Sequence, residues 1–208
     1  MKRLAIFDLD GTLIDSRADL AASGNYAREA IGLSSLPLAT VSSFVGDGLD
    51  KLIERLVPAA EKRGEAKDIF ETHYSQHCCD QTRPFAGIVE TLAALQTHGW
   101  ILAVATNKPG LFTETILRGC GIFHYFNQVR AGDGARKPDP GQLLDLMACT
   151  GVTVQNTWMI GDHHTDVRAG QAAGCRVAFC LWGMGHRDQL SVDVQVASPQ
   201  ELLLALAA

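Results

Sequence analysis

The first residues of this chain form a short apolar run that stops at acidic residues. The run begins at Lys2 and continues through Ile6 and Phe7 until Asp8 interrupts it. It is too short for a helix, and its continuous apolar character is typical of a strand buried on both faces. We therefore predict that the chain opens with a buried strand of a parallel sheet.

The stretch that follows changes to helical spacing. Apolar side chains recur every three to four residues over 17–31 and 49–57, and more weakly over 66–78. No strand pattern is present over 14–83. Because a long structureless connection is improbable in a compact domain, we predict an all-helical insertion after the first strand.

After Pro84 the helix and strand patterns alternate as far as the end of the chain. The predicted helices cover 88–98, 111–118, 140–149, 166–173 and 199–206, and the predicted strands cover 100–105, 128–131, 157–160, 176–181 and 194–196. This alternation is typical of an α/β fold with a parallel sheet. We expect two domains, an α/β core of residues 1–14 and 85–208 and a helical domain of residues 15–84.

Polar side chains follow these strands at the points where they end. Ligands of such sheets bind beyond the carboxyl ends of the strands, so we expect these side chains to converge on one crevice. Asp8 and Asp10 leave the first strand on the same side, and Gly11 then allows a sharp turn. The later strand ends and turns add Thr106, Asn107, Lys108, Arg136, Lys137, Asp139, Asp162, His163, His164 and Asp166.

This set of side chains suits phosphate chemistry that uses a hard metal ion. Asp8 and Asp10 would repel each other at close range unless a cation or a reaction used them. Carboxylates are ligands that Mg²⁺ prefers, and hydroxyl, amide and lysine groups bind phosphate oxygens. Taken singly, each residue also has a structural explanation, as a turn residue, a helix cap or a solvated charge. Their joint placement favours a Mg²⁺-assisted phosphoryl-transfer site.

Four motifs resemble those of the haloacid dehalogenase superfamily. In chain order they are Asp8-x-Asp10-Gly11-Thr12, Thr106 after a strand, Lys137-Pro138, and Gly161-Asp162-x-x-x-Asp166. The resemblance covers nearly the whole chain. It implies a Rossmann-like core, with a parallel sheet and helices on both faces, and an all-helical cap inserted after the first strand. The segment from Ser43 to Gly48 resembles the cap of phosphoglycolate phosphatase-like members.

The resemblance implies two catalytic carboxylates and a magnesium ion. Asp8 would attack phosphorus to form an aspartyl-phosphate, a role that suits a carboxylate because it needs no deprotonation. Asp10 would donate a proton to the leaving alkoxide and later take one from the attacking water. Mg²⁺ would be held by Asp8, the backbone carbonyl of Asp10 and Asp162. The expected function is hydrolysis of a small phosphomonoester, with 2-phosphoglycolate as the leading substrate.

The remaining motif residues would bind phosphate or support the site. By the same resemblance, Thr106, Asn107 and Lys137 would bind the phosphoryl oxygens, which need preorganised donors in the transition state. Asp166 would orient the site from behind the metal ligands.

The inserted cap would close over the crevice, exclude water and set specificity. Its candidate substrate contacts are Arg17, Gly46, Gly48 and Lys51, with Ser16 and Asp47 beside them.

Two adjacent histidines depart from the family pattern. His163 and His164 follow Asp162, where many relatives have serine. They could bind a transition metal, or they could be surface histidines or lie behind the metal ligands. Adjacent side chains on an irregular turn seldom converge on one ion, and the acidic residues already suit Mg²⁺. We therefore expect histidines without a metal.

Several other functions remain as alternatives. Asp10 and Asp162 argue against a haloacid dehalogenase proper, which needs no metal. Phosphomutase-like relatives carry an arginine where this chain has Leu49, so hydrolysis is favoured, although Lys51 or Arg55 could substitute. Pyrophosphate and sugar phosphates are further candidate substrates. A non-catalytic phosphate-binding or receiver-like module is the alternative of a different class, but receiver modules are smaller and have no helical insertion.

Charge and composition narrow the partners. The chain has 18 basic and 23 acidic residues, a net charge of −5, and no basic run with interleaved aromatic residues, so nucleic acid is not an expected partner. The N-terminus shows no signal-peptide pattern, and no apolar stretch approaches the ~18 residues of a membrane span. We expect a cytoplasmic protein whose partner is a small phosphorylated metabolite, and the sequence does not indicate an oligomeric state.

Overall fold

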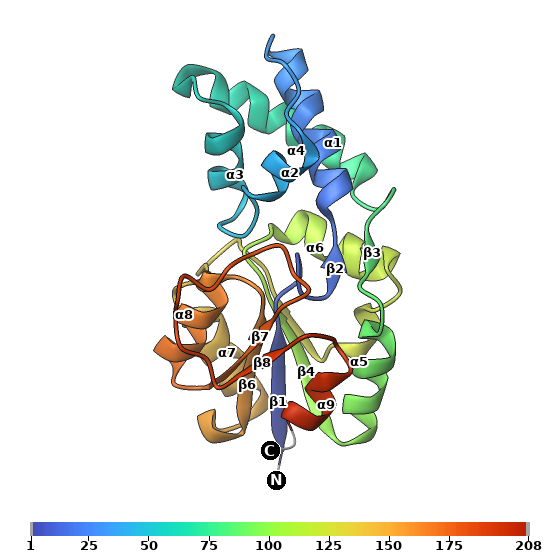
Figure 1. Cartoon of the computed structure of the whole chain (residues 1–208), viewed down its shortest axis with the longest axis vertical. Coiled ribbons are helices and arrows are strands. Elements are labelled where there is room, and N and C mark those ends of the chain that lie inside the picture. The colour runs from blue at the N-terminus through green and yellow to red at the C-terminus, as the bar shows by residue number, and fades with distance from the viewer. Residues whose placement is uncertain (1, 207–208) are drawn as a thin grey trace.

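A six-stranded parallel sheet forms the centre of the α/β part of the molecule. The computed structural model describes residues 2–206, and its sheet has the strand order β5-β4-β1-β6-β7-β8 with every neighbouring pair parallel (Figure 1). The strands are β1 (Arg3–Phe7), β4 (Trp100–Ala105), β5 (Gln128–Arg130), β6 (Thr157–Gly161), β7 (Arg176–Cys180) and β8 (Val194–Val196). The prediction of a parallel sheet is confirmed. Met1 and residues 207–208, which the predicted core includes, lie outside the described residues.

Helices cover both faces of this sheet. One face packs on α5 (Ile88–Thr97), α6 (Gly110–Gly119) and α9 (Glu201–Ala205), and the other on α7 (Gly141–Thr150) and α8 (His164–Ala173). Alternate residues of β1 belong to two different apolar clusters, one on each face of the sheet. Ala5 and Phe7 belong to the first cluster, and Leu4 and Ile6 to the second. This alternation follows from the two-residue repeat of a strand, and it explains why β1 is apolar along its whole length.

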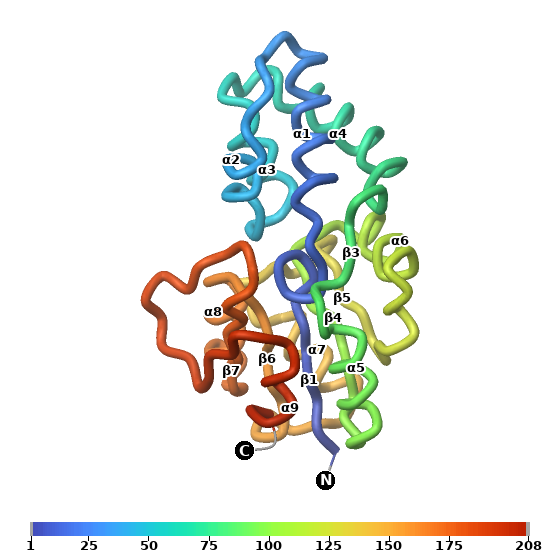
Figure 2. Tube along the Cα trace, turned by 45° about the vertical axis from the view of Figure 1, so that its right-hand side comes forward, coloured from blue at the N-terminus to red at the C-terminus, as the bar shows by residue number. Residues whose placement is uncertain are grey.

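A helical insertion follows β1 and lies beyond the carboxyl ends of the strands (Figures 1 and 2). It contains α1 (Arg17–Ala30), α2 (Leu38–Ser42), α3 (Leu49–Leu56) and α4 (Arg63–His77). The chain also forms single 3₁₀ turns at Ala60–Lys62, Phe123–Tyr125 and Val154–Asn156. The expected helical insertion is present, and α2 is an addition, because its five residues are too few to show a periodic pattern. The division of the chain into two domains stays a prediction.

The prediction that no strand occurs between Ile14 and Arg83 is wrong at both ends of that range. The short strands β2 (Ile14–Asp15) and β3 (Arg83–Pro84) pair antiparallel, with Ile14 opposite Pro84. These are the segments by which the chain leaves the sheet and returns to it. Two residues are too few to show strand alternation, and the pairing depends on contacts far apart in the sequence.

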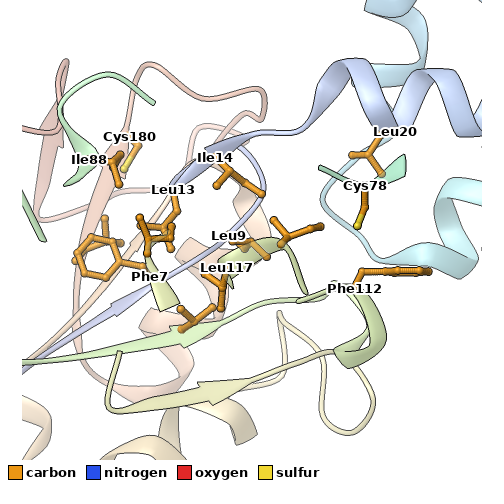
Figure 3. Close-up of a cluster of buried hydrophobic side chains, with 14 of the residues drawn as sticks. Phe7, Leu9, Leu13, Ile14, Leu20, Cys78, Ile88, Phe112, Leu117 and Cys180 are labelled. Carbon is orange, nitrogen blue, oxygen red and sulfur yellow. The ribbon is translucent and has the colours of Figure 1, made fainter. Parts of the chain in front are cut away.

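The apolar core continues from the sheet into the insertion. Figure 3 shows Phe7, Leu13 and Leu9 toward one end of this cluster and Leu20, Cys78 and Phe112 toward the other. The insertion therefore contacts the sheet through buried apolar side chains as well as through the backbone connections at β2 and β3. Within residues 2–206, every helix is too short or too polar to cross a membrane.

Candidate active site

Three neighbouring strands bring the candidate residues to one edge of the sheet. Asp8 follows β1, Thr106 follows β4 and Asp162 follows β6, and β1 lies between the other two strands. The Asp8 N–H donates to the carbonyl of Ile160 at 2.9 Å, and the Thr106 N–H donates to the carbonyl of Arg130 at 3.0 Å. The sheet hydrogen bonds thus fix the backbone directly beneath the site.

A buried cluster of three carboxylates and one ammonium lies at this edge. One carboxylate oxygen from each of Asp8, Asp162 and Asp166 lies within 4.8 Å of the others. The Lys137 Nζ donates to Asp8 Oδ1 at 2.7 Å and to Asp166 Oδ1 at 2.6 Å. All four residues are buried. With all three carboxylates ionised and the lysine protonated, the cluster has a net charge of about −2, which a divalent cation would balance.

Burial and, to a smaller extent, the neighbouring charges shift the pKa values of the cluster. Burial raises the pKa of Asp8 to about 8, and the neighbouring Asp166 and Asp162 add to the effect against the opposing influence of Lys137. Burial, followed by the charge of Asp166, raises the pKa of Asp162 to about 6. Burial by itself would lower the pKa of Lys137, but the two carboxylates outweigh it and raise that pKa. The carboxylates thus need additional positive charge to be fully ionised at neutral pH.

The donor set fits a hard divalent cation. Every candidate ligand in the cluster is a carboxylate oxygen, the ligand type that Mg²⁺ selects, and a bound dication would supply the missing positive charge. Asp162 is already oriented. Its Oδ1 accepts from the Thr12 hydroxyl at 3.0 Å, and its Oδ2 accepts from the N–H groups of Met184 and Gly185, both at 2.8 Å. Such support behind a ligand is typical of metal sites.

A glycine allows the turn after β1 to pass over Asp162. Gly11 has a φ of +90°, and a Cβ there would lie 2.3 Å from Asp162 Oδ2. A larger residue would therefore both strain the backbone and displace the carboxylate.

Asp10 points to a different set of partners. The Lys108 Nζ donates to both of its carboxylate oxygens, at 3.0 and 3.1 Å, and the Ser16 hydroxyl donates to Oδ1. The Lys108 ammonium also lies 4.8 Å from the centre of the Tyr74 ring. Sequence reasoning placed Lys108 at a strand end but gave it no role. Its position directly after Thr106 and Asn107 was the available signal.

The two other predicted phosphate-binding residues lie beside these acids. The Thr106 hydroxyl accepts the Lys108 N–H at 3.1 Å. The Asn107 side chain donates to the carbonyl of Lys137 at 2.8 Å and to that of Gly46 at 3.1 Å. Asn107 thus links the core to the inserted helical segment. Among residues 2–206 its Oδ1 is buried without a hydrogen-bond partner.

A pocket opens between these polar residues and the helical insertion. Its core side is formed by Asp8, Asp10, Thr106, Asn107, Lys108, Pro109 and Phe112, and its insertion side by Leu20, Val45, Gly46, Gly48, Leu49, Leu52, Phe70 and Tyr74. The apolar wall was missed from the sequence, because a residue that lines a pocket has the same helical spacing as one that fills a core. The Tyr74 hydroxyl is buried without a hydrogen-bond partner among residues 2–206.

The four cap candidates divide into two pairs. Gly46 and Gly48 line the pocket, and each has a positive φ. Arg17 is exposed and pairs with Asp15, and Lys51 is exposed and pairs with Glu54 at 2.7 Å. Neither of these cations lines the pocket.

The two adjacent histidines lie together, and a third histidine joins them. The ring centres of His163 and His164 are 4.1 Å apart, and that of His186 lies 5.5 Å from the first and 5.4 Å from the second. Burial lowers the pKa of His163 to about 4, so its imidazole is neutral at pH 7. His186 lies 22 positions after His164 in the chain, so the sequence alone does not associate the two rings.

Comparisons with known proteins agree with one another. The family model of haloacid dehalogenase-like hydrolases matches residues 5–180. A phosphoglycolate phosphatase of Thiobacillus denitrificans is 35% identical over 97% of this chain and 94% of its own. A phosphoglycolate phosphatase of Neisseria meningitidis is 36% identical over 90% of this chain and 83% of its own.

The fold comparison gives the same result. A crystal structure described as a predicted phosphoglycolate phosphatase from Haemophilus somnus 129PT superposes with a TM-score of 0.93 at 30% identity, covering 98% of this chain and 97% of the other.

Proposed function

This chain belongs to the haloacid dehalogenase-like hydrolases, and from that premise we propose that it is a Mg²⁺-dependent phosphatase that hydrolyses a small phosphomonoester, 2-phosphoglycolate first of all. One observation carries the proposal. Asp8 and Asp10, two residues apart, both face the same pocket beneath the helical insertion, while Lys137 holds Asp8 from behind. That arrangement puts a nucleophile and a proton donor within reach of one bound phosphate.

The metal ligands of the proposal are Asp8, the backbone carbonyl of Asp10 and Asp162. Asp166 lies close enough to the other carboxylates to contribute, but its oxygens already accept from Lys137 and from the His163 N–H, which suits an orienting role. When bound, Mg²⁺ supplies the positive charge that lets a phosphate dianion approach the buried carboxylates.

In the first half-reaction an Asp8 oxygen attacks phosphorus. The new O–P bond makes an aspartyl-phosphate as the bond from phosphorus to the substrate alkoxide breaks, and Asp10 protonates that alkoxide. Thr106, Asn107 and Lys137 would bind the phosphoryl oxygens. Lys108, which donates to both oxygens of Asp10 in the structure, would also donate to the entering phosphate.

In the second half-reaction water attacks the phosphorus of the aspartyl-phosphate. Asp10, now ionised, takes the proton of that water, the P–O bond to Asp8 breaks, and inorganic phosphate leaves with the Asp8 carboxylate regenerated. One residue serves both steps because each step leaves Asp10 in the protonation state that the other requires.

The choice of substrate rests on the pocket and on the relatives. The pocket wall from the insertion is mostly apolar, and Lys108 is its one cation among the described lining residues. A small phosphomonoester with a carboxylate, such as 2-phosphoglycolate, could place that carboxylate near Lys108. The relatives with the matching length are phosphoglycolate phosphatases by name.

The test is phosphate release from a panel of phosphomonoesters, pyrophosphate and sugar phosphates, measured with Mg²⁺ and with EDTA. We expect Mg²⁺-dependent release with 2-phosphoglycolate as the best substrate, and loss of at least 10³-fold in kcat for Asp8→Asn, as is typical when a nucleophile is removed. Asp68→Asn, an exposed change on α4, is the matched control and should retain full activity.

Different results would refute different parts of the proposal. Release that survives Asp8→Asn would exclude Asp8 as the nucleophile. Release that persists in EDTA would exclude the metal. A panel led by pyrophosphate or by a sugar phosphate would keep the chemistry and replace the substrate.

A further inference from the structure

Outside the proposed catalytic centre, three histidines converge on one point of the surface. One ring nitrogen from each of His163, His164 and His186 lies within 4.8 Å of the other two. His163 is the N-cap of α8 and His164 its first residue, whereas His186 belongs to the loop after β7. Figures 1 and 2 show that loop, in red, beside α8.

We propose that His163, His164 and His186 form a second metal site, distinct from the carboxylate cluster, that binds a first-row transition metal ion such as Zn²⁺. Imidazole nitrogens suit Zn²⁺, Co²⁺, Ni²⁺ and Cu²⁺, whereas the oxygen-only cluster at Asp8 suits Mg²⁺. The proposal does not depend on the phosphatase reaction.

The hydrogen bond of His186 leaves a ring nitrogen free for a metal. His186 Nδ1 lies 2.7 Å from Asp188 Oδ1. When Nδ1 donates to such an oxygen, the Nε2 lone pair remains available, which is the arrangement found around metal-bound histidines. His163 Nδ1 instead accepts the Thr165 N–H at 3.4 Å and lies 3.0 Å from the Thr165 hydroxyl. Binding through Nε2 of His163 therefore requires its ring proton to move to Nδ1, where the Thr165 hydroxyl can accept it.

The third ring has an unsatisfied nitrogen. His164 Nδ1 is buried and has no hydrogen-bond partner among residues 2–206. Its closest acidic neighbour, Asp188 Oδ2, lies 3.7 Å away, and Asp47 Oδ1 lies 3.8 Å from Nε2 on the other side. Leaving a buried polar atom unpaired costs about 1–3 kcal/mol, and a bound cation would satisfy it.

The surrounding backbone leaves room at His163. A Cβ on Gly46 would lie 2.7, 2.7 and 2.9 Å from Cδ2, Nε2 and Cε1 of that ring. Because these distances are nearly equal, Gly46 packs over the face of the imidazole and not along the in-plane direction of the Nε2 lone pair. A metal bound in the ring plane would not meet Gly46.

Small side-chain movements complete the geometry. Nitrogens bound to a tetrahedral Zn²⁺ at about 2.0–2.1 Å are about 3.4 Å apart, so separations of up to 4.8 Å must shrink by at most roughly 1.4 Å. Side-chain rotations are sufficient for this, because His186 is exposed, with 68% of its side chain accessible. Exposure of His186 also gives the ion a route from solvent, and Asp188 or water can provide the fourth ligand.

Such an ion would link the loop that contains His186 to the start of α8, and this loop also orients Asp162. The N–H groups of Met184 and Gly185, immediately before His186, donate to the Asp162 carboxylate. Binding should therefore stabilise the folded chain in proportion to metal concentration, since an ion that binds only the native state raises its stability.

The experiment uses Co²⁺ as a visible probe, in a large excess of Mg²⁺ that occupies the carboxylate cluster. For the wild-type chain we expect saturable binding of about one equivalent with the absorption of nitrogen-ligated Co²⁺. His186→Gln should weaken that binding at least tenfold. Zn²⁺ should raise the Tm of the wild type in the same buffer and leave the Tm of His186→Gln unchanged.

The matched control is His77→Gln. His77 has the same kind of partner, since its Nδ1 lies 2.8 Å from Asp80 Oδ2, and it stacks on His73 at 4.4 Å. Comparison of the variants in EDTA shows whether each folds with the stability of the wild type.

Three outcomes would overturn the proposal. The first is Co²⁺ binding that His77→Gln abolishes and His186→Gln does not, which would place the ion on α4. The second is binding that excess Mg²⁺ removes, which would place the ion in the carboxylate cluster. The third is wild-type protein that shows no nitrogen-ligated Co²⁺ spectrum.

Discussion

At the scale of single residues, the buried acids determine how the protein responds to pH. Asp8 and Asp162 both have a pKa above the ordinary value of 3.8. A carboxyl group whose pKa is higher in the folded chain than in the unfolded chain binds protons more strongly when folded. Its contribution to stability is full below the unfolded pKa and is lost as the pH rises through the folded one.

We therefore predict that the protein in EDTA becomes less stable as the pH rises from 3.8 through about 6 for Asp162 and about 8 for Asp8. Thermal unfolding at a series of pH values measures this, and a loss of 1 kcal/mol lowers the Tm of a chain of this size by about 2–4 °C. Added Mg²⁺ should stabilise most at the high-pH end, because the ionised carboxylates bind it. An Asp8→Asn variant should show a weaker pH dependence, and an unchanged slope would contradict the assignment.

Lys108 is the second residue whose role can be separated by mutation. It is buried, contacts both oxygens of Asp10 and lines the pocket. For Lys108→Met we predict a loss in kcat/KM of about tenfold or more for 2-phosphoglycolate, which corresponds to about 1.4 kcal/mol. The loss should be smaller for p-nitrophenyl phosphate, which has no carboxylate.

The comparison for Lys108→Met is Lys51→Met, because Lys51 is exposed, pairs with Glu54 and lies outside the pocket lining. Its kinetic constants should match those of the wild type. Equal losses with both substrates in Lys108→Met would assign Lys108 to phosphate or to Asp10 alone.

At the scale of elements, the turn between α2 and α3 contacts two residues of the candidate site, Asn107 and His163. Gly46 has a φ of +123°, its carbonyl accepts from Asn107, and it packs on the His163 ring. The backbone there needs a conformation that other residues adopt only with strain, and the space for a side chain is already filled.

Gly46→Ala should therefore destabilise the protein by about 1–3 kcal/mol and lower kcat/KM, because the turn must move away from Asn107. Gly64→Ala, in α4, is the matched control, since nothing lies within 4 Å of a Cβ there. Alanine at that helical position should be neutral or stabilise by up to about 1 kcal/mol. Urea unfolding and steady-state kinetics on the two variants measure both effects. Equal stability of the two variants would argue against strain at Gly46.

The elements also show which features a sequence can predict. β4 occurs at the expected residues because an apolar run of that length, bounded by polar residues, has few alternatives. β8 also occurs where it was expected, with its two valines on either side of Gln195. β2 and β3 were missed because each is a strand only through its pairing with the other, and the whole insertion separates them in sequence.

In the site, the motif residues Asp8, Asp162 and Lys137 converge as parallel-sheet geometry requires. Of the residues that the insertion supplies to the pocket, the sequence indicated Gly46 and Gly48 but not the apolar wall. Tyr74 and Phe70 have ordinary helical spacing, and Arg17 and Lys51 carry charges that the fold directs elsewhere.

At the scale of the whole molecule, an exposed ion pair joins the insertion to the loop before α7. Arg136, in the loop before α7, pairs with Asp50 of α3 at 2.9 Å, and Asp50 also pairs with Lys67 of α4 at 2.7 Å. Both Arg136 and Asp50 are substantially exposed. Exposed pairs of this kind contribute about 0–1 kcal/mol and are screened by salt.

Asp50→Asn should consequently change stability by less than about 1 kcal/mol, yet alter KM, because the pair bridges the two sides of the pocket. The effect on KM should diminish as the ionic strength rises. Asp68→Asn changes an exposed acid elsewhere on the insertion, and it should change neither the stability nor the KM. A large fall in Tm for Asp50→Asn, or a salt-independent KM, would show that this pair does more than hold the two sides together.

The antiparallel pairing of β2 and β3 also bears on whether the insertion could be replaced by a segment of another protein. The two crossings of the chain lie side by side, with Asp15 opposite Arg83, so the core meets the insertion at a single paired junction. A foreign segment whose ends are equally close could replace residues 16–82 without changing the register of the six-stranded sheet. We therefore expect that recombination at this junction could change the pocket wall while keeping the candidate-site residues at the strand ends.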